Sequence, residues 1–375
     1  MRATRAVIHT ENLKYNLDSV RKLTGPNVKI CLAVKADAYG HGSVGISRAA
    51  QSFGTEYLAV AAVSEAEILR KGGVTIPILL LGPALPEETE KAAELDLEMV
   101  ISTDGELKQI IMASKGRETG VHLKIDTGMG RIGCSPSDAL RLAKAISKTA
   151  GIKLAGLCTH FPVSDSNSAD DIDFTKKQIK LFSQAADEIR AEGINPGILH
   201  AANSGAILNH PEAHFDMVRP GIYAYGFLPG GENGLIDKPA PELKPKPVMS
   251  FESKLMHIKK VAAGTAISYG RIYTTEEESW IGTIPAGYAD GYNRRLSNSG
   301  WVVINGERYP VAGTVCMDQL MVNLGPELKA ELYDRAILFG FEEGAATAED
   351  LTNITGSIPY ELLCAVSKRV PRIFV

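Results

Sequence analysis

Several kinds of segment are absent from this 375-residue sequence or scarce in it. No apolar run approaches the length needed to cross a membrane, and residues 1–8 lack the apolar core of a signal peptide. The five cysteines are scattered and no pair has the spacing of zinc ligands, so we expect a reduced, cytoplasmic setting and no metal site. The formal net charge of -4 gives no indication of a nucleic acid or an anionic membrane as partner. Composition alone thus predicts a cytosolic enzyme or binding protein.

What is present describes an ordinary globular chain with ample core, at 45% hydrophobic and 22% charged residues. From residue 28 to 222 apolar strand-like runs alternate with amphipathic helix-like segments, such as 64–71, 87–95, 136–148 and 174–192. The predicted strands are 29–34, 57–62, 76–81, 97–102, 121–125, 154–159, 197–202 and 215–218. Eight βα units in succession predict an α/β fold of the (β/α)8 TIM-barrel type rather than an open sheet. The run 5–9 and the helical segment 10–23 are expected as an extension before it.

The pattern changes after Gly226. Residues 228–247 are rich in proline, glycine and charge, which is typical of a linker. Short alternating runs follow at 248–261, 279–284, 301–304, 307–312 and 320–324, and Asn305-Gly306 between two of them predicts a two-residue hairpin. We therefore expect a barrel domain over 1–240 and a mainly antiparallel β domain over 241–375.

Lys35 directly follows the apolar run 30–34 and precedes a turn broken by Gly40 and Gly42. This places an amine at the carboxyl end of a buried strand, where α/β enzymes keep their chemistry. Such an amine can form a Schiff base with an aldehyde, which suggests pyridoxal phosphate. A lone lysine there would more simply be a snorkelling surface residue, so the assignment depends on its neighbours.

Other polar residues also follow predicted strands, and all fall on the rim that carries active sites in barrels. They are Lys124, Asp126 and Arg131 at the end of the fifth strand and in its glycine-rich exit, His160 after the sixth, Asn203 and Ser204 after the seventh, and Arg219 and Gly221 after the eighth. Singly, each has a structural explanation, such as a paired arginine, a satisfied histidine or a helix cap. Their joint placement favours a site.

The last two strand exits suggest a phosphate site. Ser204 can cap a short helix over 204–209, whose free N–H groups would face an anion. Gly221 and Ile222 can add backbone donors, because glycine allows a ligand to approach the chain closely.

Motifs along nearly the whole chain resemble those of the alanine racemase family. Residues 33–42 resemble its cofactor-binding signature, and Asn203-Ser204 with residues 219–223 resemble its phosphate- and ring-binding segments. Residues 266–270, 285–292 and 316–319 resemble family segments as well. The resemblance implies a pyridoxal 5'-phosphate enzyme that interconverts L- and D-alanine through an external aldimine. The D-alanine would supply peptidoglycan synthesis.

The resemblance also implies the roles of individual residues. Lys35 and Tyr269 would be the two bases of a two-base proton transfer. The cofactor contacts would be Lys35, Tyr39, His160, Asn203, Ser204, Arg219, Gly221, Ile222 and Tyr360. Arg219 would face the pyridine nitrogen and donate a hydrogen bond without protonating it, since arginine keeps its proton. Because a free tyrosine has a pKa near 10, the second base needs cationic neighbours, and His160 with Arg219 are the candidates.

For the substrate, the resemblance implies that Arg131 and the Met317 amide bind the carboxylate and that Tyr288 narrows the opening. Lys124 matches a lysine that is often carbamylated in the family, and we hypothesise the same modification here, which would hold Arg131 in place. Tyr269 and Met317 lie in the β domain and Lys35 in the barrel. A head-to-tail homodimer with shared active sites is implied.

Three other hypotheses for the function stay open. A protein that holds pyridoxal phosphate without turnover would need only the barrel. A fold-related amino acid decarboxylase shares both domains but typically places a carboxylate on the ring nitrogen, where this chain has Arg219. A racemase for serine or another larger amino acid is disfavoured by Tyr288.

Overall fold

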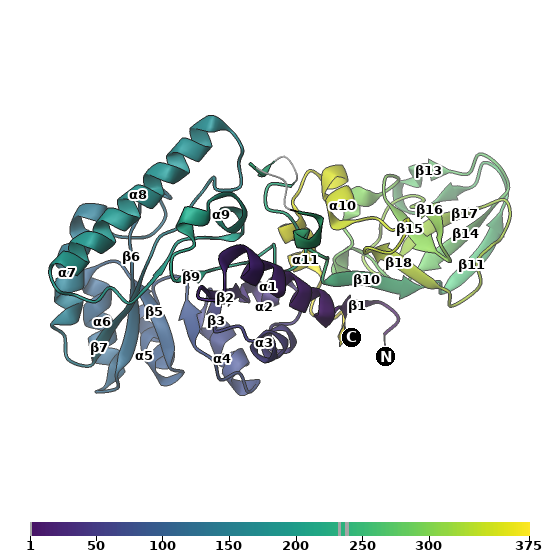
Figure 1. Ribbon diagram of the computed structural model, residues 1–375. Coiled ribbons are helices and arrows are strands. Elements are labelled where there is room, and N and C mark those ends of the chain that lie inside the picture. Colours follow the sequence, from purple (N-terminus) through teal and green to yellow (C-terminus); the bar gives the residue numbers. More distant parts are fainter. Residues whose placement is uncertain (1, 232–233, 237–239) are drawn as a thin grey trace. The chain divides into compact units, whose positions relative to one another are not determined.

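The structure, a computed structural model, describes residues 2–231, 234–236 and 240–375 and contains two compact units (Figure 1). The barrel unit comprises Asn12–Ala38 and Ser43–Lys246, and the β unit comprises Met1–Glu11, Tyr39–Gly42 and Pro247–Val375. The division thus falls at 246/247, where the sequence suggested 240/241. Of the predicted linker 228–247, residues 232–233 and 237–239 lie outside the described residues.

The barrel unit contains one sheet of eight parallel strands in sequence order. They are β2 (Lys29–Ala33), β3 (Tyr57–Val60), β4 (Ile78–Leu80), β5 (Leu97–Ile101), β6 (Thr119–Lys124), β7 (Ile152–Cys158), β8 (Ile198–His200) and β9 (Met217–Val218). β9 pairs with β2. On its other side, the Asp216 amide donates to the Leu199 carbonyl of β8 at 3.0 Å and the Arg219 amide donates to the Ala202 carbonyl after β8 at 2.8 Å. The predicted eight-stranded barrel is confirmed.

Helices alternate with these strands and lie outside them (Figure 1). They are α1 (Thr10–Thr24), α3 (Ser43–Ser52), α4 (Val63–Lys71), α5 (Pro86–Glu94), α6 (Asp104–Ser114), α7 (Pro136–Ser147), α8 (Ala169–Ala191) and α9 (Ser204–Asn209). In α7 the buried positions 139, 142, 143 and 146 follow the helical period, so one stripe of the helix faces the sheet. Ser135 accepts a hydrogen bond from the Asp138 amide and fixes where α7 begins. Among the described residues no helix combines the length and the apolar character needed to cross a bilayer.

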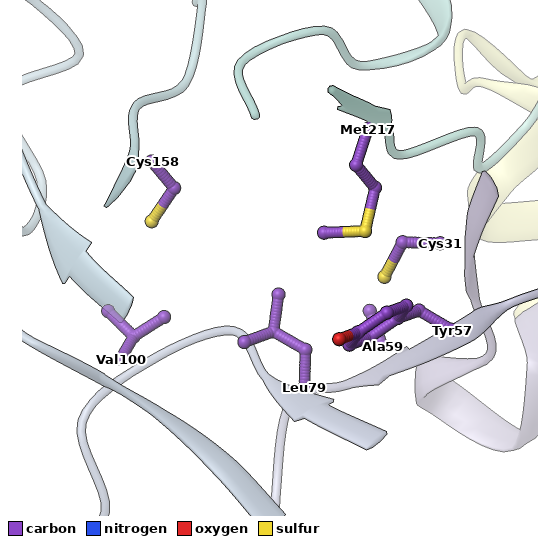
Figure 2. Close-up of a cluster of buried hydrophobic side chains, with 7 residues drawn as sticks. All are labelled: Cys31, Tyr57, Ala59, Leu79, Val100, Cys158 and Met217. Carbon is purple, nitrogen blue, oxygen red and sulfur yellow. The ribbon is translucent and has the colours of Figure 1, made fainter. Parts of the chain in front are cut away.

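The interior of the barrel is lined by every second residue of each strand. Figure 2 shows one apolar cluster from this lining, made of Cys31, Tyr57, Ala59, Leu79, Val100, Cys158 and Met217. Because side chains of a strand alternate between faces, the same face continues two residues further along the chain. That step leads from Cys158 to His160 and from Met217 to Arg219, so the lining ends in polar groups at the carboxyl rim.

The β unit holds three sheets. The largest has the order β16-β15-β18-β10-β1-β19, with β16 (Glu307–Pro310), β15 (Trp301–Ile304), β18 (Arg335–Phe339), β10 (Met249–Lys254), β1 (Arg5–Ile8) and β19 (Arg372–Phe374). The others are β11 (His257–Val261), β14 (Ser279–Ile284) and β17 (Leu320–Gly325), and the pair β12 (Ala266–Ile267) and β13 (Tyr273–Thr274). Among the strands described in this unit, β1 and β19 are the one pair that runs in parallel. The predicted mainly antiparallel domain is confirmed, and it also carries α10 (Ala348–Thr355) and α11 (Pro359–Ala365).

Two local features of the β unit bear on the sequence predictions. The run 5–9 is not an extension of the barrel, because β1 lies between β10 and β19 and buries Ala6 and Ile8 in their sheet. The hairpin at Asn305-Gly306 is confirmed, with φ of 52° and 81° at its two turn residues, as a two-residue turn between right-twisted strands requires.

Candidate active site

Lys35 begins a left-handed turn at the end of β2. The segment α2 (Lys35–Tyr39) has positive φ at Ala36, Asp37, Ala38 and Tyr39, between 52° and 55°. For residues other than glycine this conformation costs about 1–2 kcal/mol each. Surrounding contacts must therefore hold the turn that carries Lys35.

Within the barrel unit, Glu65 of α4 supplies much of that support. One carboxylate oxygen accepts from the Ala36 amide at 2.6 Å, and the other accepts from the Ala61 and Ala62 amides at 2.8 and 3.2 Å. The Ser43 amide also donates to Asp37 Oδ1 at 2.7 Å. The sequence alone does not predict this role of Glu65, because its place near the start of α4 is a capping signal that does not reveal the contact beside Lys35.

The predicted rim residues of the barrel unit converge around His160, which follows β7. Burial lowers the pKa of His160 well below its ordinary value, and the positive charges of Arg219, Lys124, Arg131 and Lys35 act in the same direction. The imidazole is consequently neutral. Of the two residues expected to form a network at Tyr269, Arg219 is therefore the charged one, and the network itself stays a prediction.

Arg219 is almost fully buried and is fixed by several acceptors. Its Nη2 donates to the carbonyls of Thr159 and Ala201 at 2.7 and 2.9 Å and lies 3.2 Å from His160 Nδ1. Its Nη1 donates to Nδ1 of His200 at 2.7 Å. The guanidinium therefore has one orientation, set by the ends of β7 and β8.

Lys124 ends β6 and is buried. Burial, assisted by the charges of Arg219 and Arg131, lowers the pKa of Lys124 to about 8. A substantial fraction of this amine is neutral near pH 8, unlike an ordinary lysine.

The glycine-rich exit after β6 is organised by Asp126. Its carboxylate accepts from the Gly128 and Gly130 amides at 2.9–3.1 Å. Burial opposes its ionisation, but these amides hold the pKa of Asp126 below its ordinary value. Arg131 projects from this loop and is exposed.

At the β8 exit the structure corrects the predicted cap. Asn203, not Ser204, caps α9: its Oδ1 accepts from the Ala206 amide at 3.0 Å and from Ser164 Oγ at 2.7 Å. Ser204 is the first residue of the helix, and its Oγ accepts from the amides of Gly221 and Tyr223 at 2.9 and 3.4 Å. The exits of β8 and β9 are thereby joined at the predicted phosphate segments, where Ile222 is buried.

In the β unit, Tyr39 lies beside Tyr360 of α11, with 6.0 Å between ring centroids. Burial raises the pKa of Tyr39, so its phenol stays protonated. A side chain at Gly40 would meet the Leu363 carbonyl at 2.1 Å, which explains the glycine after Tyr39. The two predicted phosphate-contacting tyrosines are thus neighbours.

Three other predicted site residues of the β unit are exposed: Tyr269 by 74%, Met317 by 54% and Tyr288 by 42%. Backbone contacts join their segments, because the Tyr288 amide donates to the Cys316 carbonyl at 3.0 Å and Thr314 Oγ1 donates to the Tyr269 carbonyl at 2.8 Å. We call Tyr269, Tyr288 and Met317 the exposed triad.

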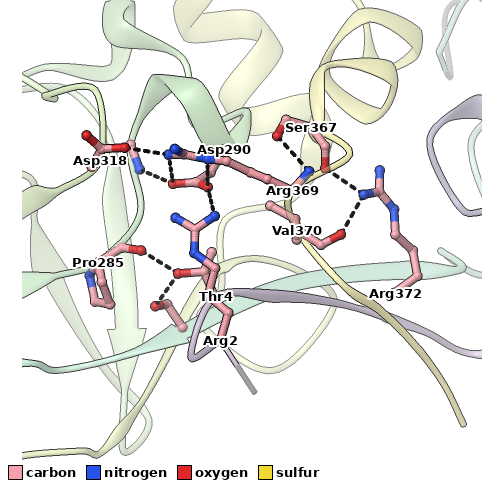
Figure 3. Close-up of polar contacts among 11 residues, drawn as sticks. Arg2, Thr4, Pro285, Asp290, Asp318, Ser367, Arg369, Val370 and Arg372 are labelled. Atoms are coloured by element: carbon pink, nitrogen blue, oxygen red, sulfur yellow. Dashed lines mark hydrogen bonds and ion pairs between the residues drawn. The ribbon is translucent and has the colours of Figure 1, made fainter.

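A buried carboxylate supports this part of the unit (Figure 3). Asp290 accepts from Arg369 at 2.7 and 3.0 Å and from the Gly287 amide at 3.0 Å, and it pairs with Arg2. Arg369 also pairs with Asp318, the neighbour of Met317, at 2.8 Å. One arginine therefore connects the segments that carry Tyr288 and Met317.

The sequence models of the alanine racemase N-terminal and C-terminal domains match residues 8–229 and 248–374. The alanine racemase of Treponema denticola is 46% identical, over 100% of this chain and 99% of its own length. The solved alanine racemase of Clostridium difficile 630 superposes with a TM-score of 0.93 at 37% identity, covering 100% of this chain and 96% of that one. An alanine racemase from Bacillus anthracis with bound L-Ala-P has a TM-score of 0.88 at 33% identity, covering 100% and 95%. With two family domains, full-length relatives and the shared fold, the chain belongs to the alanine racemase family.

Proposed function

We propose that this protein is a pyridoxal 5'-phosphate-dependent enzyme that interconverts L- and D-alanine by two-base proton transfer, in the cytoplasm, and supplies D-alanine for peptidoglycan synthesis. The observation that carries the proposal is the convergence of Lys35, Arg131, Lys124 and Arg219 on His160 at the barrel rim. None of the five cysteines, all within the described residues, forms a disulfide, which agrees with a reducing compartment.

The residues of the barrel unit fit pyridoxal phosphate. Lys35 supplies a primary amine at a strand end, and Arg219 supplies a buried donor that stays charged. Ser204 Oγ accepts two amide hydrogens, so its own hydroxyl proton can be donated to a phosphate oxygen. Asn203 holds this segment in place by capping α9. When bound, the cofactor supplies an aldehyde for the amino group and a ring that withdraws electrons from Cα.

Side chains of the protein transfer the protons in this reaction. Lys35 takes or returns the Cα proton on one face, and the Tyr269 phenol does so on the other. Arg219 would hold the ring nitrogen by a hydrogen bond without giving up its proton, which would limit electron withdrawal by the ring and favour return of the proton to Cα. Arg131 and the Met317 amide bind the substrate carboxylate, and Tyr288 restricts the side chain to a small group.

Lys124 is proposed to be carbamylated. A neutral amine is required to attack carbon dioxide, and the lowered pKa of Lys124 provides one near neutral pH. The carbamate would carry a negative charge close to Arg131 and Arg219, whose positive charges stabilise it.

The exposed triad supports a head-to-tail homodimer. Its three large side chains are exposed on the β unit, and exposed groups of this kind often mark a contact surface. The barrel rim of a second copy would bury them. Each site would then combine Lys35 of one copy with Tyr269 of the other.

A coupled assay for D-alanine on the purified protein, with an absorbance scan in the Schiff-base region, tests the function. We expect D-alanine to form from L-alanine while the band is present. A Schiff-base band without D-alanine would indicate a protein that only holds the cofactor. Release of carbon dioxide from basic amino acids would indicate a decarboxylase. Faster turnover of serine than of alanine would indicate a racemase for a different amino acid.

A further inference from the structure

A line of polar side chains runs through the interior of the barrel unit from Arg219 to Glu98. Nη1 of Arg219 is 2.7 Å from Nδ1 of His200, whose Nε2 is 2.8 Å from Nδ1 of His122. His122 Nε2 is 2.6 Å from Glu98 Oε2. The two imidazoles are fully buried, and the Glu98 side chain is about one quarter exposed, at 23%.

The line connects the two ends of the barrel. Arg219 follows β9 at the carboxyl rim, whereas Glu98 is the second residue of β5, near the amino end of its strand. His122 lies in the middle of β6, directly after a register shift, and faces Gly156 of β7. A side chain at Gly156 would meet His122 Nδ1 at 2.5 Å, so this glycine provides the space for the ring.

Only one hydrogen arrangement satisfies all the contacts. Arginine can only donate, so Nδ1 of His200 must accept and its Nε2 must carry the hydrogen. That hydrogen points at Nδ1 of His122, which must accept in turn, leaving the hydrogen of His122 on Nε2 for Glu98. An ionised carboxylate can only accept, so the two ends of the line impose the same direction.

A second proton on either imidazole would place two N–H groups against each other. If His122 were doubly protonated, the single hydrogen of His200 would collide with His122 or with Arg219. The electrostatics agree, since burial and the charge of Arg219 hold the pKa of His200 well below its ordinary value. For Glu98, burial is the largest influence and would raise the pKa, but the hydrogen bonds from His122 and Tyr57 and the nearby positive charge together lower it.

We propose that Glu98 and His122 are positioning residues that keep His200 in its Nε2–H tautomer, so that its Nδ1 lone pair holds the Arg219 guanidinium in place. Without the terminal acceptor, Arg219 alone imposes this direction, and a fraction of the molecules can reverse both His122 and His200 to Nδ1–H, which would turn a donor toward Arg219. The guanidinium would then lose one of its fixed contacts. The step from there to catalysis rests on the proposed function, because it requires Arg219 to act at the cofactor ring.

Nitrogen-15 NMR of the histidine side chains in the purified full-length protein tests the tautomers directly, with and without added pyridoxal phosphate. Wild-type His200 and His122 should each show a bare Nδ1 and a protonated Nε2, assigned with His200→Gln and His122→Gln. A wild-type His200 with its hydrogen on Nδ1 would overturn the proposal without any variant of Glu98.

Two substitutions at Glu98 separate its role as a hydrogen-bond acceptor from the effect of its negative charge. Glu98→Leu removes the acceptor, and we expect a second set of Nδ1–H signals together with a fall in kcat of about tenfold at little change in KM. Glu98→Gln keeps an acceptor oxygen and should restore the tautomer and most of kcat. Tyr57→Phe is the matched control, because the Tyr57 hydroxyl donates to the other Glu98 oxygen at 3.4 Å and lies outside the line.

Unchanged tautomers and kcat in Glu98→Leu would refute the positioning role. If Glu98→Leu does not fold, the wild-type spectrum still decides, because a His200 that carries its hydrogen on Nδ1 would refute the role equally. Changed tautomers in a protein that does not racemise alanine would leave the positioning of Arg219 standing and remove the proposed function instead.

Discussion

Lys124 shows how the barrel interior changes the chemistry of a single residue. An ordinary lysine is almost wholly protonated at pH 8, but burial beside Arg219 and Arg131 lowers the pKa of Lys124 to about 8. The neutral fraction of this amine therefore rises as the pH increases through 8, well before that of surface lysines.

We predict that Lys124 binds carbon dioxide covalently. With carbon-13 bicarbonate, the purified protein should show a carbamate signal by NMR that grows from pH 7 to pH 9, because more of the amine becomes neutral. Lys124→Met should lack the signal. No signal in the wild type, or an equal one in Lys124→Met, would contradict the modification.

At the scale of elements, the left-handed turn after β2 is the least expected feature. Four successive residues without glycine adopt positive φ, and the contacts from Glu65 and Asp37 offset the cost. Strain of this kind persists where the surroundings determine it, and here it sets the direction in which the chain leaves Lys35.

Ala36→Gly should consequently be neutral or should raise the free energy of unfolding, by up to about 1 kcal/mol, because glycine adopts positive φ without a steric cost. Ala145→Gly, at a half-buried position of the right-handed helix α7, is the control and should lower the free energy of unfolding by about 1 kcal/mol. Urea unfolding of both variants measures the difference. If Ala36→Gly lowered the free energy of unfolding as much as Ala145→Gly, the turn would carry no such strain.

How far the sequence predicts this fold depends on how local the signal is. The eight barrel strands and the Asn305-Gly306 hairpin follow from apolar runs and turn residues, and they were predicted. The location of β1 was not, because its partners β10 and β19 lie more than two hundred residues away in the chain. Strand pairing over that separation leaves no local trace.

The site shows the same limit. The sequence predicts Lys35, Lys124, Arg131, His160 and Arg219 as site residues because each ends or follows a predicted strand. Glu98, His122 and His200 lie inside strands. The sequence signal for them is a polar residue at a position expected to face the barrel interior. The cap at Asn203 and the neutral state of His160 depend on contacts with other loops and on charges that only the folded barrel assembles.

For the whole molecule, the central claim is that each active site draws its two bases from different copies of the chain. Tyr269 is three-quarters exposed, so Tyr269→Phe should fold normally and lose about 10²–10⁴-fold in turnover in both directions. Lys35→Ala should be inactive as well. Alone, each variant leaves open which copy supplies the missing group.

Hybrid dimers of these variants decide the matter. Each chain carries its own affinity tag, and the hybrid of Lys35→Ala with Tyr269→Phe is purified through both tags and assayed for D-alanine. If the sites are shared, one of the two sites contains both bases, and the hybrid should show about half of the wild-type turnover. A hybrid of the wild type with a chain carrying both substitutions should then be inactive. The reverse pattern, with an inactive first hybrid and a half-active second, would contradict the shared site.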